Sequence, residues 1–240
     1  MTAPHWSVVV PAFNETRRLP HYLDEIVAYF QGRGEDYEVL VVDDGSTDGT
    51  LTCVEMVGRR HPAVRGLRLA ENAGKGSAVR RGMLAVTGQR RLFTDADGAT
   101  PIAELKRLEA AFAAGADIAI GSRVLPDPSV SVSAPAHRVA AGRLFNWLVA
   151  RLGLRGIADS QCGFKAFTAA AAQDLFPRLT TGGFGFDVEL LMLARARGYR
   201  IIEVPVNWAD QPGSKVGVLK DGPRMLWEIV RAALRARRGR

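Results

Sequence analysis

The chain has 240 residues, of which 47% are hydrophobic and 24% are charged. This composition is typical of a soluble globular protein and excludes intrinsic disorder, a collagen-like repeat and a disulfide scaffold. The two cysteines, Cys53 and Cys162, are far apart in the sequence and indicate a reducing compartment. No apolar run approaches the roughly 20 residues that span a bilayer, and the start lacks the pattern of a signal peptide. We therefore expect a cytoplasmic protein.

The positive charge is concentrated in the second half of the chain. Residues 1–120 contain 14 Lys and Arg against 16 Asp and Glu, whereas residues 121–240 contain 18 against 9. Six of those 18 are arginines within the last 17 residues. A basic half of this kind favours a polyanionic partner, which can be nucleic acid, an acidic membrane surface or a phosphorylated substrate.

The first half alternates between strand and helix patterns. The expected strands are Ser7–Pro11, Glu38–Val42, Val64–Leu69, Arg91–Thr94 and Asp117–Gly121. The expected helices between them are Leu19–Phe30, Thr50–Arg60, Lys75–Val86 and Pro101–Ala114. This alternation predicts right-handed βαβ units and an α/β fold, in which helices flank a mostly parallel sheet.

The second half is less regular. The expected helices are Arg138–Leu152, Phe186–Arg197 and Pro223–Arg238, and the expected strands are Cys162–Phe167 and Ile201–Val206. The segment Pro126–Pro135, rich in Ser and Pro, is expected to form a mobile loop. Because no repeat and no long linker interrupts the chain, we expect a single domain over residues 1–240.

Polar and acidic residues follow three of the expected parallel strands. Asn14-Glu15 follows the first strand, Asp43-Asp44 the second and Asp95–Asp97 the fourth. Ligands of such sheets bind beyond the carboxyl ends of the strands, so these clusters predict a site on one rim. Asp43, Asp44 and Ser46 can also serve as turn and N-cap residues ahead of the next helix.

The Asp95-Ala96-Asp97 motif is the candidate metal site. Residues two apart on a strand point the same way, so both carboxylates can meet one hard cation. Mg²⁺ or Mn²⁺ often takes one or two carboxylates and completes its coordination with substrate phosphates. Lys75, in the Gly-flanked turn at residues 72–76, lacks the spacing of a P-loop but is a candidate phosphate contact.

Eight motifs occur in a fixed order along the chain, namely VVVPAFNE, VVDDGSTDGT, NAGKGSAVRRGM, FTDADGAT, IGSR, DSQCGFKAF, FDVELL and VPVNW. Together they resemble the family-2 glycosyltransferases of GT-A fold over essentially the whole chain. The nearest branch is that of the dolichyl-phosphate β-glucosyltransferases, with the dolichol-phosphate mannose synthases next. The motifs DADGAT and SQCGFK favour the glucosyl branch.

The resemblance implies an inverting, metal-dependent transfer of glucose from a nucleotide sugar, expected to be UDP-glucose, to a polyprenyl phosphate, giving a β-linked product. Residues 1–120 would be the nucleotide-sugar and metal half, and residues 121–240 the acceptor half. By matching motifs, the nucleotide would be held by Pro11, Phe13, Glu15 and Asp44, with Asp43, Lys75 and Asp95 as neighbouring candidates. Asp95 and Asp97 would contact Mg²⁺ or Mn²⁺. Arg123 and Arg138 would meet the acceptor phosphate.

The acceptor chemistry decides which catalytic groups are needed. A phosphate monoester, with a second pKa of about 6, is largely ionised at neutral pH and needs positioning by arginine rather than a base. In many inverting relatives an acidic residue in the later region acts as base, and Asp187 or Asp159 can occupy that place. Asp187 is equally an N-cap candidate, and Asp159 is expected to be a turn residue. Cys162 is expected to be buried packing rather than a nucleophile.

The C-terminal helix predicts contact with an anionic membrane. Apolar residues including Leu226, Ile229 and Val230 recur at helical spacing, with Trp227 beside them and arginines around them. The alternative is a helix packed on the domain with a basic tail in solvent. Eukaryotic glucosyl enzymes carry an N-terminal membrane anchor, whereas this chain begins at its first expected strand. We therefore expect the helix at residues 223–238 to bind peripherally at the cytoplasmic face.

Three other functions fit parts of the sequence. The chain can be a polyprenyl-phosphate mannose synthase that uses GDP-mannose, or a soluble transferase that acts on a phosphorylated small molecule. It can also be a basic nucleic-acid-binding module, which the arginine-rich end favours. The acidic rim and the lack of a nucleic-acid-binding motif argue against that module, so we expect no nucleic-acid partner.

Overall fold

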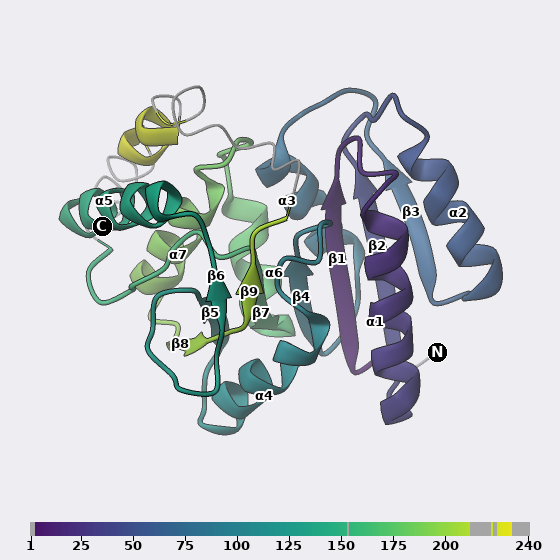
Figure 1. Ribbon diagram of the computed structural model, residues 1–240, viewed down its shortest axis with the longest axis horizontal. Coiled ribbons are helices and arrows are strands. Elements are labelled where there is room, and N and C mark those ends of the chain that lie inside the picture. Colours follow the sequence, from purple (N-terminus) through teal and green to yellow (C-terminus); the bar gives the residue numbers. More distant parts are fainter. Residues whose placement is uncertain (1–2, 153, 212–221, 223–224, 232–240) are drawn as a thin grey trace.

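The computed structural model describes residues 3–152, 154–211, 222 and 225–231 (Figure 1). A seven-stranded sheet has the order β3-β2-β1-β4-β7-β5-β8. Its strands are β1 (Trp6–Ala12), β2 (Tyr37–Asp43), β3 (Val64–Arg68), β4 (Arg90–Thr94), β5 (Ile118–Ser122), β7 (Phe164–Thr168) and β8 (Ile201–Pro205). All neighbours pair in parallel except β7, which is antiparallel to both β4 and β5. The predicted α/β fold with a mostly parallel sheet is confirmed.

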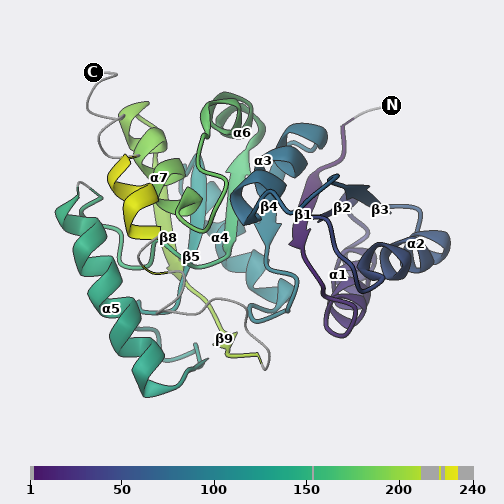
Figure 2. The same cartoon turned by 90° about the horizontal axis from the view of Figure 1, so that it is seen from above.

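Helices cover both faces of this sheet (Figure 2). They are α1 (Leu19–Arg33), α2 (Thr50–Arg60), α3 (Lys75–Ala85), α4 (Leu105–Ala113), α5 (Ala136–Arg151), α6 (Ala169–Leu175) and α7 (Phe186–Ala196), with short 3₁₀ turns η1 (Ile102–Glu104) and η2 (Phe176–Arg178). Residues 225–231 are also helical, and the rest of the expected helix at residues 223–238 lies outside the described residues. No helix in the described ranges combines the length and the apolar character needed to cross a bilayer.

The alternation of side chains along β1 explains why the sheet is covered on both sides. Val8 and Val10 lie in one hydrophobic core with residues of α1, α2 and α4. Val9 points to the opposite face and lies in a second core with residues of α3, α6 and α7. Strands that are buried on both faces read as continuous apolar runs, as VVVPA at residues 8–12 of β1 does.

The segment Pro126–Pro135, expected to be a mobile loop, contains the short strand β6 (Val132–Ser133). This strand pairs in parallel with β9 (Trp208–Ala209). Ser131 N donates to the side chain of Asn207, and Arg107 Nη1 lies 3.2 Å from Asp127 Oδ2. The structure therefore anchors the segment at both ends. Ser and Pro composition alone did not indicate these contacts, because their partners are far away in the sequence.

Helix α3 lies unusually close to the sheet at Gly82. A Cβ atom at this position would lie 2.4 Å from Val9 Cγ1 and 2.9 Å from Val42 Cγ2. Real Cβ atoms do not approach other atoms so closely, so glycine is required here by packing. This close contact fixes α3, and with it the loop that precedes α3, over the carboxyl ends of β1 and β2.

We expect Gly82→Ala to lower the free energy of unfolding by about 1–3 kcal/mol, the usual cost of an overpacked core. The matched control is Gly32→Ala in α1, where a Cβ would meet no atom within 4 Å. This control should raise stability by up to about 1 kcal/mol, because alanine favours a helix over glycine. Urea unfolding followed by circular dichroism measures both values. Equal stability of Gly82→Ala and the wild type would contradict the close packing.

Candidate functional site

The Asp95 carboxylate lies at the end of β4, in a space that a glycine leaves open. A Cβ at Gly163 would lie 2.1 Å from Asp95 Oδ2, so only glycine is compatible with this carboxylate position. Asp95 N also donates to the Gly163 carbonyl at 3.1 Å. The segment before β7 therefore packs directly against Asp95, the first carboxylate of the motif.

Two cationic side chains lie against the two carboxylates. Lys75 Nζ, at the start of α3, is 2.6 Å from Asp95 Oδ1, and Arg18 Nη1 is 3.7 Å from Asp97 Oδ2. Burial and the charge of Asp95 raise the pKa of Asp97 above its ordinary value. Burial alone would lower the pKa of Lys75, but Asp95 and Asp187 hold it above its ordinary value. The site is thus a cluster of opposite charges at the rim.

The donor set of this cluster fits a divalent cation such as Mg²⁺ or Mn²⁺. The Asp95 and Asp97 side chains are 38% and 23% exposed, so both carboxylates are accessible to a ligand. The described residues contain no group of three or more His, Cys, Asp or Glu that could hold a metal. Two carboxylates are nevertheless a sufficient protein contribution for these ions when substrate phosphates supply further oxygens.

The second acidic pair, after β2, divides into two roles. Asp44 accepts hydrogen bonds from Ala73 N at 2.8 Å and Gly74 N at 2.9 Å, and so holds the loop that carries Lys75. Asp43 Oδ1 accepts from Ser46 N at 3.0 Å, which confirms the expected turn chemistry for this oxygen. Asp43 Oδ2 is buried and has no hydrogen-bond partner within the described part of the chain. Arg68 Nε lies 3.8 Å from Oδ2, beyond hydrogen-bond distance, so Oδ2 can still accept a hydrogen bond from a ligand.

The segment after β1 positions Arg18. Pro11 is buried in β1 and Phe13 is half-buried just beyond it. The Glu15 carboxylate accepts from Arg18 Nε at 2.8 Å and from Arg18 Nη2 at 2.6 Å. Arg18 was not among the predicted site residues, although its spacing of three residues from Glu15 is one at which an acid and a base can pair.

The predicted acceptor residue Arg123 follows β5 and is held by a carboxylate. Its Nε lies 2.7 Å from Asp159 Oδ2 and its Nη2 lies 2.8 Å from Asp159 Oδ1. Burial would raise the pKa of Asp159, but Arg123 holds it below its ordinary value. Gln161 N donates to Asp159 Oδ1 at 3.2 Å, the local turn contact that was expected, and the pairing with Arg123 is a further role. Arg138 lies in the first turn of α5, and its side chain lies outside the described residues.

Asp187 is buried beneath the rim. It lies in the first turn of α7, but the N-cap residue is Gly185, so the alternative of an N-cap role for Asp187 is wrong. Asp187 Oδ1 is 2.6 Å from Nζ of Lys165, which is fully buried. Burial raises the pKa of Asp187 above its ordinary value. The role of Asp187 as a base stays a prediction, and Lys165 was not among the predicted site residues.

Cys162, beside Lys165, is also fully buried. Burial, followed by the charge of Asp159, raises the pKa of the Cys162 thiol to about 12. A thiol with such a high pKa is protonated at neutral pH and is a poor nucleophile. The expected packing role of Cys162 is confirmed.

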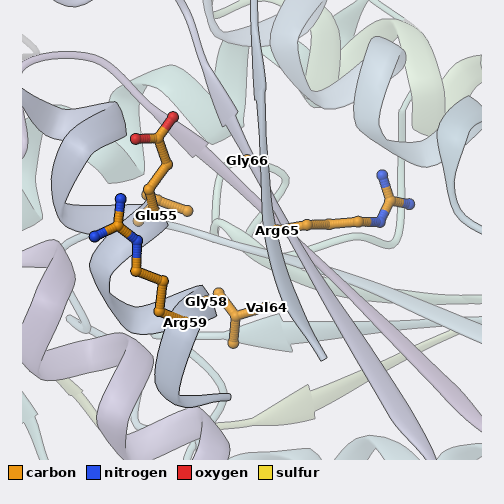
Figure 3. Close-up of a pocket in the computed structure, with 7 residues that line it drawn as sticks. Glu55, Gly58, Arg59, Val64, Arg65 and Gly66 are labelled. Carbon is orange, nitrogen blue, oxygen red and sulfur yellow. The ribbon is translucent and has the colours of Figure 1, made fainter. Parts of the chain in front are cut away.

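A separate hollow of about 450 Å³ lies at the β3 edge of the sheet, against α2 (Figure 3). In Figure 3, Glu55 and Arg59 project from α2, while Arg65 extends from β3 in another direction. The lining residues are Val54, Glu55, Gly58, Arg59, Val64, Arg65 and Gly66. None of the predicted site residues lies among them. The candidate site is therefore the charged rim rather than this hollow.

The chain matches the family model described as Glycosyl transferase family 2 over residues 7–176. It is 42% identical over 223 residues to the dolichyl-phosphate beta-glucosyltransferase of Drosophila melanogaster, covering 88% of this chain and 68% of that protein. Identity to the Saccharomyces cerevisiae protein of the same name is 35% over 245 residues, covering 93% and 72%. For the Homo sapiens protein it is 38% over 223 residues, covering 88% and 69%.

Solved structures show a likeness in fold. The glucosyl-3-phosphoglycerate synthase of Mycobacterium tuberculosis, solved with Mn²⁺, UDP and phosphoglyceric acid, superposes with a TM-score of 0.72 at 22% identity. The match covers 97% of this chain and 78% of that chain. The GT-A fold that the sequence motifs implied is thereby confirmed.

The Arg123–Asp159 pair generates a pH-dependent contribution to stability. We expect Asp159→Asn to lower the free energy of unfolding at neutral pH by about 1.5–3 kcal/mol, the usual value of hydrogen bonds to charged groups. Because the folded-state pKa of Asp159 is depressed, this contribution is present above the unfolded pKa of about 3.9 and is lost as the pH falls through the folded value.

Urea unfolding of the wild type and Asp159→Asn over a pH series tests this expectation. The difference in stability should be full at neutral pH and should narrow progressively below pH of about 3.9. A difference that stays constant across the acid range would show that the Asp159 charge makes no contribution.

Proposed function

The chain belongs to glycosyl transferase family 2, and from this we propose that it transfers glucose from UDP-glucose to a dolichyl-type polyprenyl phosphate. The displacement inverts the anomeric carbon and gives a β-linked lipid phosphate sugar. The names of the relatives support glucose and dolichyl phosphate over mannose and a small soluble acceptor. The observation that carries the proposal is the Asp95 and Asp97 pair at the end of β4, beside Lys75 and Arg18.

We assign the donor to the first half of the chain and the acceptor to the second. Strands from residues 1–120 and 121–240 share one sheet, which supports a single domain. Pro11, Phe13 and Glu15 form the nucleotide side of the rim together with Asp43. Asp43 Oδ2, which forms an ion pair with Arg68 but has no hydrogen-bond partner in the described part of the chain, would accept an N–H or O–H of the nucleoside. A fold neighbour solved with Mn²⁺ and UDP-glucose supports this donor. The acidic rim supports the absence of a nucleic-acid partner.

The reaction places growing negative charge on the leaving diphosphate. Asp95 and Asp97 would hold Mg²⁺ or Mn²⁺, which when bound supplies Lewis-acid stabilisation of that charge. Lys75 and Arg18 put two further positive charges beside these carboxylates and favour a diphosphate there. Glu15 also orients Arg18, and Asp44 acts indirectly by holding the loop that carries Lys75.

The acceptor needs orientation more than deprotonation. Its phosphate, with a second pKa of about 6, is largely ionised at neutral pH and is already nucleophilic. Arg123 is held by Asp159 and would orient this phosphate together with Arg138. Asp187 is fully buried and paired with Lys165, so we assign it an electrostatic role beneath Lys75 in place of proton abstraction.

The lipid acceptor lies in a membrane, so the protein needs a surface that contacts the membrane. Exposed apolar side chains indicate where this surface is. Two neighbouring helical segments, α5 and residues 225–231, carry them (Figures 1 and 2). The most exposed are Leu144 at 60%, Trp147 at 52%, Leu226 at 38%, Trp227 at 58% and Val230 at 37%. We call these five residues the lipid face.

Arginines accompany both tryptophans of the lipid face. The Arg151 guanidinium lies 4.7 Å from the Trp147 ring, and that of Arg231 lies 4.4 Å from the Trp227 ring. Tryptophan favours the membrane interface, and arginine is attracted to the anionic lipids of a cytoplasmic leaflet. We propose that the lipid face binds this leaflet peripherally. It extends the expected membrane contact from residues 223–238 to α5.

The function is tested by incubating the purified protein with Mg²⁺, UDP-glucose and a short-chain dolichyl phosphate. We expect a β-linked dolichyl phosphate glucose, identified by mass spectrometry and NMR. EDTA should stop the reaction. Asp97→Asn should lower kcat by about a hundredfold or more, because several kcal/mol of charge stabilisation are lost, and it should weaken Mn²⁺ binding measured by electron paramagnetic resonance.

A second variant distinguishes contacts to the acceptor phosphate from contacts to the donor nucleotide in the same assay. Arg123→Lys keeps a charge beside Asp159 but loses the two-pronged contact, so the KM for the lipid phosphate should rise about tenfold while UDP affinity is unchanged. Full turnover in EDTA would contradict the proposed metal dependence of the reaction. Preference for GDP-mannose would replace glucose as the sugar, and equal loss of UDP binding in Arg123→Lys would move this arginine to the donor side.

Membrane binding is tested by point substitutions, because Ile229 is fully buried in the core and truncation of the helix would damage the fold. Trp147→Gln and Trp227→Gln should each weaken co-sedimentation with anionic vesicles about five- to thirtyfold, as expected for partial loss of one apolar side chain. High salt should weaken binding further by screening the arginines.

The matched control is Met56→Gln on α2, where Met56 is 60% exposed but lies outside the lipid face. It should bind vesicles like the wild type. If Met56→Gln weakens binding as much as the tryptophan variants do, the contact is unspecific and the lipid face is wrong.

A further inference from the structure

A short glycine-rich segment before α7 receives a carboxylate from the C-terminal helical residues. The segment comprises residues 181–185, with the sequence TGGFG. Gly185 N donates to Glu228 Oε2 at 3.0 Å. A Cβ at Gly183 would lie 2.3 Å from Glu228 Oε1, and a Cβ at Gly185 would lie 2.9 Å from Glu228 Oε2. The Glu228 carboxylate thus occupies a cradle that exists only because both positions are glycine.

The other side of the 181–185 segment packs against the loop that carries Lys75. A Cβ at Gly74 would lie 2.4 Å from the Gly182 carbonyl oxygen, and a Cβ at Gly76 would lie 2.5 Å from the Thr181 carbonyl oxygen. Ser77 N also donates to the Gly182 carbonyl at 3.2 Å. The two backbones are therefore in direct contact, and a shift of one must shift the other.

Lys75 stands between the two glycines of this contact. Its Nζ is 2.6 Å from Asp95 Oδ1 and 6.0 Å from the centre of the Phe186 ring, which directly follows the 181–185 segment. A continuous series of contacts runs from Glu228 through the segment to Lys75 and then to Asp95. A displacement of the Glu228 carboxylate can therefore be passed along these contacts to Lys75 at the candidate donor site.

A second carboxylate shows that this segment is held at both ends. Glu189 accepts from Thr180 Oγ1 at 2.6 Å and from Thr181 N at 2.7 Å. Glu189 belongs to α7 and is fixed by the domain itself. Glu228 differs, because it comes from the helical residues 225–231 that also carry Trp227 of the lipid face.

We propose that Glu228 is a positioning residue for the donor site, which ties the lipid-facing helix to Lys75 through the 181–185 segment. This inference rests on the proposed function for the identity of the donor. Glu228 does not belong to the carboxylate rim, and its effect passes through the backbone contact at Gly74 and Gly76. Displacements of about 1 Å at a reacting centre can lower the rate about a hundredfold. The position of Glu228 can therefore affect the rate although this residue does not touch the reacting atoms.

The test compares Glu228→Ala with Glu228→Gln in buffer without vesicles. Calorimetry with UDP and Mg²⁺ should show that Glu228→Ala weakens binding about three- to thirtyfold, the range for residues that couple through a packed network. Glu228→Gln should restore most of the affinity, because its side-chain oxygen still accepts from Gly185 N. With a short water-soluble acceptor, Glu228→Ala should raise the KM for UDP-glucose and leave the KM for the acceptor unchanged.

Two further variants distinguish loss of the contact between Glu228 and the 181–185 segment from a general loss of folded structure. Glu55→Ala, at an exposed glutamate on α2 outside the candidate site, should bind UDP like the wild type. Gly183→Ala puts a methyl group where the Glu228 carboxylate lies, so it should reproduce the defect of Glu228→Ala. The double variant Gly183→Ala/Glu228→Ala should lose less affinity than the two single variants added together, because both disturb the contact between Glu228 and the 181–185 segment.

Amide hydrogen exchange of peptides that cover residues 181–186 measures the order of the segment in the absence of nucleotide. Exchange should rise in Glu228→Ala and return toward the wild-type rate in Glu228→Gln. Unchanged exchange, or UDP affinity equal to the wild type in both Glu228→Ala and Gly183→Ala, overturns the inference while the proposed function stands. A wild type that binds no UDP overturns the proposed donor, and the exchange result still decides whether Glu228 orders the segment.

Discussion

The candidate site depends on how the chain neutralises two carboxylates placed two residues apart at the end of β4. Burial, and then the negative charge of Asp95, raise the pKa of Asp97. Lys75 and Arg18 balance them, and each cation is itself positioned by a further carboxylate. Glu15 grips Arg18, and Asp44 holds the loop of Lys75. Beneath them the buried pair of Asp187 and Lys165 continues the alternation of charge. Much of the polar structure at the rim follows from the need to keep these two acids ionised and accessible.

The parts of this arrangement that follow from local pattern could be predicted from the sequence. Val8, Val9 and Val10 read as a buried strand, and the acidic residues after the parallel strands had to meet at one rim. The antiparallel insertion of β7 could not be predicted, because FKAFT has the same local pattern in either direction. Lys165 was missed for a related reason, since a lysine in a strand normally indicates solvent. It is buried here only because Asp187 arrives from a distant helix.

The glycines around Lys75 illustrate the same limit. Asn72-Ala73-Gly74-Lys75-Gly76 resembles a phosphate loop only superficially, and the sequence gives no reason for its two glycines. In the structure each glycine permits close contact with the backbone of residues 181 and 182. That partner is more than 100 residues away in the chain, so no local rule identifies it. Glycines in a sequence pattern typical of a ligand loop can instead serve a contact between two loops.

The helical residues 225–231 unite two requirements that the sequence could only treat as alternatives. Ile229 packs into the core and Glu228 enters the glycine cradle, while Trp227 and Val230 remain exposed. The helix is therefore packed on the domain and presents an apolar surface at the same time. If contact with the membrane stabilises this helix, Glu228 transmits part of that stabilisation to the donor site. Because binding free energies are linked reciprocally, donor binding must then strengthen membrane binding by the same factor, and the loaded enzyme is held where its lipid acceptor lies.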